Sequence, residues 1–139
     1  MITLSVNIDV DDLRRGIAFY EAAFGFTLAR TLLGGTIAEL TGGPCPIFLL
    51  EKRAGSRPAD ALAATRDYRP HWTPVHLDLV VDALEPVLAR ARGAGAVQEA
   101  PVTTHAFGRL AFLRDPFGHG VCLLEPSAAG YDAVTDGRA

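Results

Sequence analysis

The stretch DPFGHGVCLLE, residues 115–125, joins a tight turn to a short apolar run that ends in a carboxylate. The Asp-Pro pair and the two glycines are typical of a turn, and the apolar run that follows is typical of a buried strand. A second run of the same form, PIFLLE, occupies residues 46–51. Each run therefore predicts the closing strand of a structural unit.

The segments that precede these two strands also resemble each other. Residues 2–10 alternate apolar and polar side chains, which predicts a strand, and VDDL at 10–13 then opens a helix that ends at Gly25. Another alternating strand leads into VDAL at 81–84, which opens a second helix that ends at Gly93. The chain therefore contains an internal repeat with a period of about 71 residues, the distance between the two VDxL motifs.

Three strand candidates follow each helix, so each half reads βαβββ. They are FTLAR, TIAEL and PIFLL in the first half and AVQEAPV, RLAFLRD and GVCLLE in the second. We expect an aspartate to cap each helix, Asp11 or Asp12 in the first half and Asp82 in the second. The sequence predicts an α+β fold built from two paired βαβββ modules.

The domain organisation follows from this repeat. We expect one domain over residues 1–126, made of module one at 1–52, a connector at 53–73 and module two at 74–126. The connector loses the periodicity, with a helical turn expected around 59–65, and the small, polar tail at 127–139 is expected to fray. Neither half can bury both faces of its sheet alone, so we expect the halves to pair, within one chain or across two, and to leave a concave surface for a ligand.

Composition argues against several classes of partner. The 139 residues include 13 Lys and Arg and 16 Asp and Glu, interspersed, for a formal net charge of −3, which offers nothing to nucleic acid or to a membrane surface. No apolar run approaches the ~18 residues that span a bilayer, and the N-terminus lacks the basic region of a secretory signal. Two cysteines, Cys45 and Cys122, cannot form a disulfide framework, so we expect a cytoplasmic protein.

Three segments carry a resemblance to a known superfamily. VDDLRRGIAFYEAAFGF at 10–26, HLDLVVDAL at 76–84 and DPFGHGVCLLE at 115–125 together resemble the vicinal oxygen chelate superfamily. That superfamily includes glyoxalase I, the bleomycin- and fosfomycin-resistance proteins and the extradiol dioxygenases. The resemblance covers residues 2–126 and is specific for the fold, whereas the fold hosts unrelated activities. It implies two βαβββ modules that each curl a sheet around a cavity, and a homodimer.

The resemblance also implies where a metal would bind, because metal-dependent members place one ligand on the first and last strand of each module. The first-strand positions here are Ser5 and His76, and the last-strand position of module two is Cys122. The last-strand position of module one is Glu51, or Phe48 if the repeat register is taken literally. His76 and Glu51 are thus the candidate metal ligands. Ser5 is a poor ligand and Cys122 replaces the usual glutamate, so we expect no cofactor, the alternative being zinc or another divalent ion.

Five side chains are candidate ligand contacts. Strand alternation places Asp78 on the face of His76, and Asn7 has the equivalent place in module one. Polar groups at matched sites of two sheets indicate a wet or ligand-filled interior. The connector ends in aromatic residues suited to stacking on a ligand. The full set of candidates is Asn7, Tyr68, Trp72, Asp78 and Cys122.

Each candidate also has a purely structural alternative. His76 suits a hydrogen-bonded strand position as well as acid–base chemistry, and Cys122 suits a buried apolar position better than that of a nucleophile. Asn7 and Asp78 are alternatively paired with connector backbone, and Trp72 is alternatively part of a plug over the sheet end. His105 and His119 are expected in turns.

Two functions remain open at this point. The first is a binding or sequestration protein of the drug-resistance type, which holds a small organic molecule in the cavity between modules without a full metal site. The second is a metal-dependent lyase, isomerase or dioxygenase of the glyoxalase type, in which an ion acts as a Lewis acid on adjacent substrate oxygens. The incomplete set of ligands favours the first.

Overall fold

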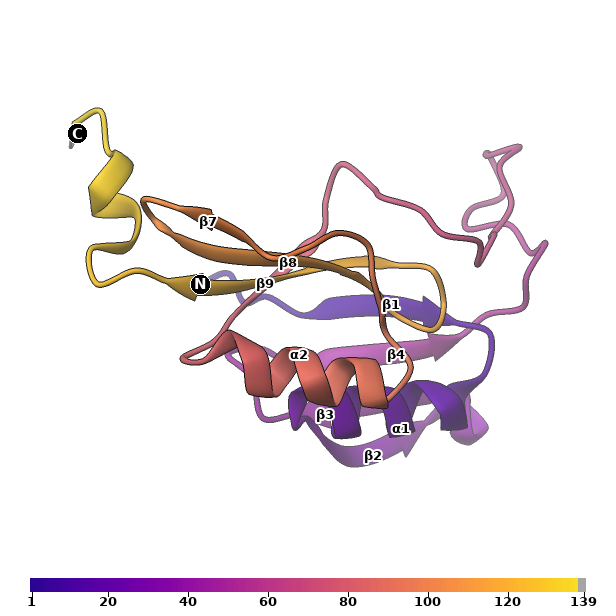
Figure 1. Ribbon diagram of the computed structural model, residues 1–139. Helices are drawn as coiled ribbons and strands as arrows, with labels where there is room; N and C mark the ends of the chain where they lie inside the picture. Colours follow the sequence, from indigo (N-terminus) through magenta and orange to yellow (C-terminus); the bar gives the residue numbers. More distant parts are fainter. Residues whose placement is uncertain (138–139) are drawn as a thin grey trace. The chain divides into compact units, whose positions relative to one another are not determined.

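The computed structural model describes residues 1–137. The chain forms two compact units, Met1–Arg69 and Pro70–Ala139, so the 53–73 connector is divided between them. Each unit combines one α-helix with one β-sheet, and the α+β class and the two repeated modules are as predicted (Figure 1).

The first unit has a four-stranded sheet in the order β1-β4-β3-β2. Strand β1 runs parallel to β4, and the other pairs are antiparallel. The elements in chain order are β1 (Val6–Val10), α1 (Leu13–Phe24), β2 (Thr27–Leu32), a short 3-10 helix η1 (Leu33–Gly35), β3 (Ile37–Thr41) and β4 (Ile47–Glu51).

The second unit has a five-stranded sheet in the order β5-β9-β8-β6, with β7 also paired to β8. Strand β5 runs parallel to β9, as β1 does to β4, so the two sheets share one topology. The elements are β5 (Leu77–Val80), α2 (Leu84–Gly93), β6 (Val97–Gln98), β7 (Thr103–His105), β8 (Gly108–Arg114), β9 (Gly120–Pro126) and a 3-10 helix η2 (Gly130–Val134).

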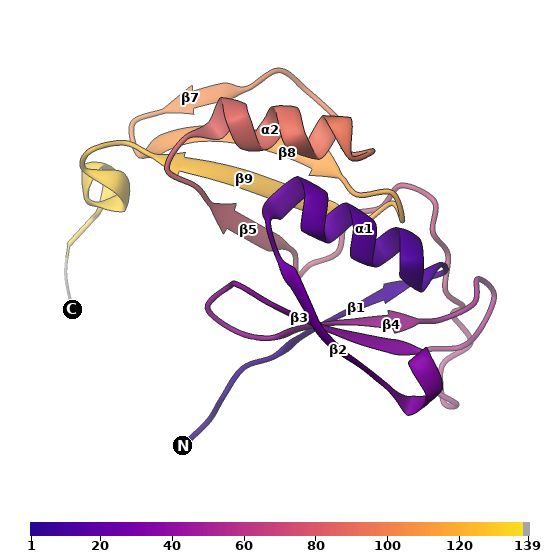
Figure 2. The same cartoon turned by 90° about the horizontal axis from the view of Figure 1, so that it is seen from below.

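The cores lie between each helix and one face of its own sheet. Helix α1 packs on β2, β3 and β4, and α2 packs on β8 and β9, over which Figure 2 shows it lying. Gly16 lets α1 approach closely, since a Cβ there would lie 3.2 Å from Leu49 Cδ1. In the second unit Leu84 and Ala91 are fully buried, as is Leu123 on β9.

Carboxylates from the last strand of each module hold the helix N-termini. Glu51 Oε2 accepts a hydrogen bond from the Leu13 N–H at 2.9 Å, and Glu125 Oε2 accepts one from the Leu84 N–H at 2.6 Å. Asp12 caps α1 in addition, as predicted. The predicted Asp82 cap was wrong, because the N-cap residue of α2 is Ala83, which has no side-chain acceptor. The carboxylate of Glu125 satisfies that helix end instead.

Several predicted boundaries were wrong. The first strand begins at Val6 and not at residue 2. Its pairing with β4 starts at Val6, whose N–H donates to the carbonyl of Pro46. The predicted strand at 96–102 is shortened to β6, and the separate strand β7 begins only after Pro101, which has no N–H to donate to a ladder. His105 ends β7, and the 59–65 segment contains turns without a helix.

The tail from residue 127 is ordered, contrary to the prediction of a frayed end. Ser127 donates from Oγ to the Ala106 carbonyl, and its N–H bonds the Phe107 carbonyl. Tyr131 of η2 stacks on Phe107, which itself stacks on His105. The tail is therefore attached to the β7–β8 hairpin, and the last part of the predicted tail, 138–139, lies outside the described residues. No helix among residues 1–137 has the length and apolar character to cross a membrane.

Candidate functional site

The two sheets each have one face that carries no helix of their own unit. Strand register places Asn7 beside Phe48, and Phe48 beside Glu39, on this helix-free face of the first sheet. In the second sheet the equivalent row is Asp78, Cys122 and Phe112. The predicted match between Asn7 and Asp78 therefore holds in the structure.

This register also decides between Phe48 and Glu51. Phe48 shares its row with Asn7, as Cys122 does with Asp78, so the PIFLLE and GVCLLE strands align literally. Glu51 has the parity of Ile47 and Leu49, which are buried on the helix side, and its carboxylate holds the α1 N-terminus. The last-strand position on the helix-free face of module one is therefore a phenylalanine.

Trp72 lies directly on strand β9. A Cβ built on Gly120 would come within 2.3 Å of Trp72 Cε3 and 2.4 Å of Cδ2, so only a glycine leaves room for the indole there. The indole N–H donates to Glu99 Oε2 at 2.8 Å. His76 and Phe112 meet the indole edge-on, with ring centroids 5.6 Å and 5.7 Å away. We call Trp72, His76, Asp78, Glu99 and Phe112 the Trp72 cluster.

The polar members of the cluster are paired. His76 Nε2 lies 3.1 Å from Asp78 Oδ1. Glu99 accepts from Trp72 with one carboxylate oxygen and pairs with Arg114 Nε at 2.7 Å through the other. Trp72 is 40% exposed, and the side chains of His76 and Asp78 are 41% and 43% exposed. The cluster thus combines fixed positions with accessible surface.

Cys122 lies beneath this surface and is 2% exposed. Burial, reinforced by the nearby Asp78 carboxylate, raises the pKa of the Cys122 thiol to about 11. The thiol is therefore protonated near neutral pH, which is the wrong state for a nucleophile. The structure supports the structural alternative for this cysteine, a small buried apolar side chain.

Module one presents a different helix-free face. Asp9 Oδ2 pairs with Arg66 Nε at 2.6 Å, and the Arg66 guanidinium also bonds the carbonyl of Arg57. The Tyr68 hydroxyl donates to the Lys52 carbonyl at 2.5 Å, and burial together with the Asp9 and Asp11 carboxylates raises the pKa of Tyr68 to about 12. These bonds attach the 53–69 part of the connector to its own unit.

The candidate residues thus fall into separate groups. Within the second unit the structure brings together Trp72, His76 and Asp78, with Cys122 beneath them. In the first unit it leaves Asn7 exposed and places the Tyr68 hydroxyl on backbone. Within residues 1–137 no three or more His, Cys, Asp or Glu side chains are grouped so as to hold a metal ion.

Sequence reasoning missed three contributors to the site. Glu99 reaches the Trp72 cluster from the segment after β6, Phe112 reaches it from β8, and Gly120 underlies it. The signal available in the sequence was Gly120, the second glycine of GHG. Its φ is not positive, so the turn itself does not require a glycine there. Its missing side chain instead leaves room for the Trp72 indole.

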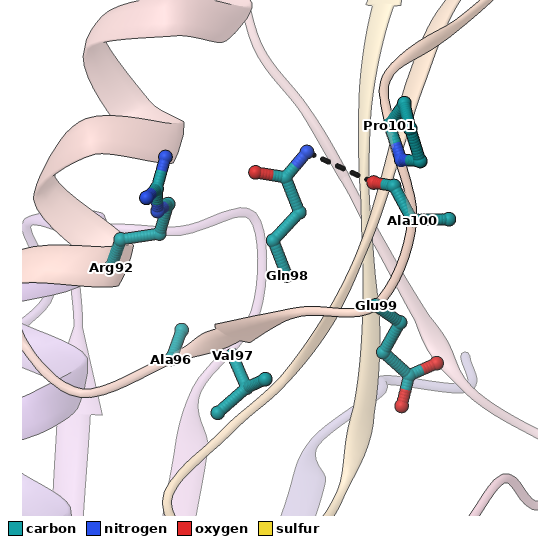
Figure 3. A pocket seen from close by; sticks show the side chains of 7 residues that line it. All are labelled: Arg92, Ala96, Val97, Gln98, Glu99, Ala100 and Pro101. Atoms are coloured by element: carbon teal, nitrogen blue, oxygen red, sulfur yellow. Dashed lines mark hydrogen bonds between the residues drawn. The ribbon is translucent and has the colours of Figure 1, made fainter.

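An open groove of about 600 Å³ lies beside the end of α2 (Figure 3). Its lining residues are Arg92, Ala96, Val97, Gln98, Glu99, Ala100 and Pro101. Gln98 Nε2 donates to the Ala100 carbonyl at 2.9 Å, and Glu99 points away from Gln98 in this view. The Glu99 carboxylate therefore belongs to the Trp72 cluster and contributes little to the groove.

Comparison with known proteins identifies the family. The model of the glyoxalase-like domain matches residues 5–124. The chain belongs to the glyoxalase-like domain family. The predicted membership of the vicinal oxygen chelate superfamily is thereby confirmed, since this match covers both modules and the fold agrees. No curated protein sequence matches the chain.

Solved structures share the fold of this glyoxalase-like protein at low sequence identity. A glyoxalase-related enzyme from Fulvimarina pelagi superposes with a TM-score of 0.69 at 16% identity, covering 88% of this chain and 86% of that one. A glyoxalase/bleomycin resistance protein/dioxygenase from Nocardioides gives 0.66 at 17%, covering 97% and 87%. The fosfomycin resistance protein FosX from Listeria monocytogenes gives 0.67 at 18%, covering 92% and 97%. At these identities the likeness concerns the fold.

Proposed function

We propose that this glyoxalase-like protein binds a small organic molecule with a planar ring on the helix-free face of its second module, without a resident metal. The observation that carries the proposal is the seating of Trp72 on Gly120, which leaves the indole 40% exposed between the edges of two other rings. A rigid, half-exposed aromatic surface supplies contact area at little entropic cost. The paired carboxylates of Asp78 and Glu99 provide hydrogen-bond acceptors beside it.

The chemistry of the available donors supports a metal-free site. Of the four positions that metal-dependent relatives use, Ser5 offers a neutral hydroxyl, Phe48 offers no donor atom and Cys122 is a buried thiol. The Glu51 carboxylate is engaged by the N-terminus of α1. His76 alone remains a standard ligand, and a tetrahedral metal site needs three or four. These residues do not fit a resident ion, so no step of the proposed function depends on one.

A second candidate function is a metal-dependent lyase, isomerase or dioxygenase. One observation favours it: His76 is accessible and its ring is oriented by the Asp78 carboxylate, as histidine ligands of metals commonly are. His76 and Glu51 remain the predicted ligands in that case, and Glu51 would have to leave the Leu13 N–H. We also propose a cytoplasmic location, which the two free cysteines support.

Calorimetric titration of the purified protein tests the binding proposal. The first probes are bleomycin and fosfomycin, which the names of two fold relatives suggest, followed by a panel of planar aromatic compounds. We expect at least one planar probe to bind, and Trp72→Ala to weaken it about tenfold, as loss of a stacked ring would. Tyr131→Ala, an exposed aromatic outside the cluster, serves as the matched control and should bind normally. Binding unchanged by Trp72→Ala would contradict the proposal.

Metal analysis separates the two candidate functions. The protein is purified without chelator, and its metal content is measured by mass spectrometry beside that of His76→Ala. The proposal expects no stoichiometric metal in either sample. A stoichiometric ion in the wild type that is lost in His76→Ala would instead establish the metal-dependent function.

A further inference from the structure

Two histidines from distant parts of the chain meet directly beside the Trp72 cluster. His71 Nε2 lies 2.8 Å from His119 Nδ1, and the two rings stand edge to face with centroids 4.8 Å apart. The residues also form a parallel β-bridge, in which the His71 N–H donates to the Gly118 carbonyl at 2.9 Å. We call these two residues the histidine pair.

The histidine pair sets the register of the two residues that follow it. In a parallel bridge the next residue on each side stands opposite its counterpart, which here places Trp72 opposite Gly120. That is the pair in which the indole covers the glycine. The segment around Trp72 belongs to no extended strand, so few other backbone bonds hold it in place.

His119 itself is held by the DPFGHG turn. The buried Asp115 carboxylate accepts from the N–H groups of Phe117 and His119 at 2.8 and 2.9 Å, and the Asp115 N–H donates to the His119 carbonyl. His119 therefore offers a fixed attachment point for His71. The DPFGHG turn, which precedes the last strand in the sequence, therefore also fixes the position of His119 in the tertiary structure.

We propose that the histidine pair is a positioning device that seats Trp72 on Gly120. This inference rests on the proposed function, because it concerns the same ligand-binding surface. A hydrogen bond between two ring nitrogens needs one N–H donor and one lone pair. Replacing either imidazole by a ring without nitrogen therefore removes this bond.

The protein contains a single tryptophan and three tyrosines, so fluorescence excited selectively at tryptophan reports on this position alone. Emission maximum and acrylamide quenching are measured on the ligand-free protein. Gly120→Ala marks the displaced state, because its Cβ would overlap the indole. Gly93→Ala is the matched control, since a Cβ there meets no atom within 4 Å, and it should give the wild-type signal.

His119→Phe keeps a ring but removes the nitrogen that meets His71. We expect its emission to shift to longer wavelength and its acrylamide quenching to rise toward the values of Gly120→Ala. His119→Gln, which retains hydrogen-bonding groups, should restore most of the wild-type signal.

Several outcomes would overturn the inference. A folded His119→Phe protein with wild-type emission and quenching would do so. If His119→Phe does not fold, His71→Phe applies the same test from the other partner. Binding of the planar probes is measured separately. If no probe binds but the ligand-free fluorescence behaves as expected, only the proposed function is contradicted. If wild type and His119→Phe bind a probe equally well, the link between the histidine pair and the ligand is contradicted.

Discussion

At the scale of single residues, Cys122 illustrates how an environment assigns a role. Its place on the last strand is where metal-dependent relatives carry a glutamate, yet the thiol is buried and its pKa is raised to about 11. Its partners in the same row, Asp78 and Phe112, are exposed. In this row, Asp78 and Phe112 are therefore accessible to a ligand, whereas Cys122 between them is buried and unreactive.

The raised pKa makes a signed prediction for stability at alkaline pH. An unfolded thiol ionises near its ordinary pKa of 9, whereas folded Cys122 retains its proton to about 11. The proton thus stabilises the fold below pH 9, and this contribution is lost as the pH rises through 11. We expect the free energy of unfolding of wild type to fall more steeply between these values than that of Cys122→Ala, as urea titrations would measure. Parallel pH profiles would contradict the assignment.

At the scale of elements, the two helices are capped by the same device with different support. In each module a glutamate at the end of the last strand accepts the first N–H of the helix. Helix α1 also has Asp12, while α2 begins at Ala83 and depends on Glu125. Arg109 connects Glu125 to Glu85 in the first turn of α2, which extends this capping arrangement.

This difference predicts unequal costs of removing the glutamates. Glu125→Ala should lower the free energy of unfolding by about 2 kcal/mol, and Glu51→Ala by about 1 kcal/mol, because Asp12 still caps α1 in the second case. Ala83 has the same extended backbone as Asp12, so Ala83→Asp should restore about 1 kcal/mol to Glu125→Ala. Chemical denaturation measures all three. Equal losses at the two glutamates would argue against separate support for the two helices.

At the scale of the whole molecule, one helix per sheet is too little to cover both faces. The helix-free face of the second sheet leaves Val80 64% exposed and Phe112 36% exposed. Apolar surface of this kind usually marks a place where another molecule binds. Members of this family bind small molecules and often form dimers.

We therefore predict a homodimer. Light scattering coupled to size exclusion should give twice the chain mass of 14.8 kDa across a dilution series. The physical reason is that pairing removes exposed apolar surface that neither module buries alone. A mass of one chain at every concentration would contradict this prediction.

The sequence by itself determined the fold. Alternation with a period of two marks which strand face is buried, helical periodicity marks the packed stripe, and both signals lie within about ten residues. The repeat then assigned Asn7 and Asp78 to equivalent positions, but it left Glu51 and Phe48 open, and the strand register of the structure pairs Phe48 with the place of Cys122. The exceptions were also local: β6 stops before Pro101, and the first strand begins at Val6, whose N–H donates to the Pro46 carbonyl.

Only the tertiary structure decided how the site is assembled. The contacts that make it join residues far apart in the chain: His71 with His119, Trp72 with Gly120 and with Glu99, and Leu84 with Glu125. No periodicity encodes such pairs, because they depend on how a connector without regular structure packs on a finished sheet. The stretch DPFGHGVCLLE shows the difference. Its pattern predicts a turn and a strand, whereas the roles of His119 and Gly120 depend on their tertiary contacts with His71 and Trp72.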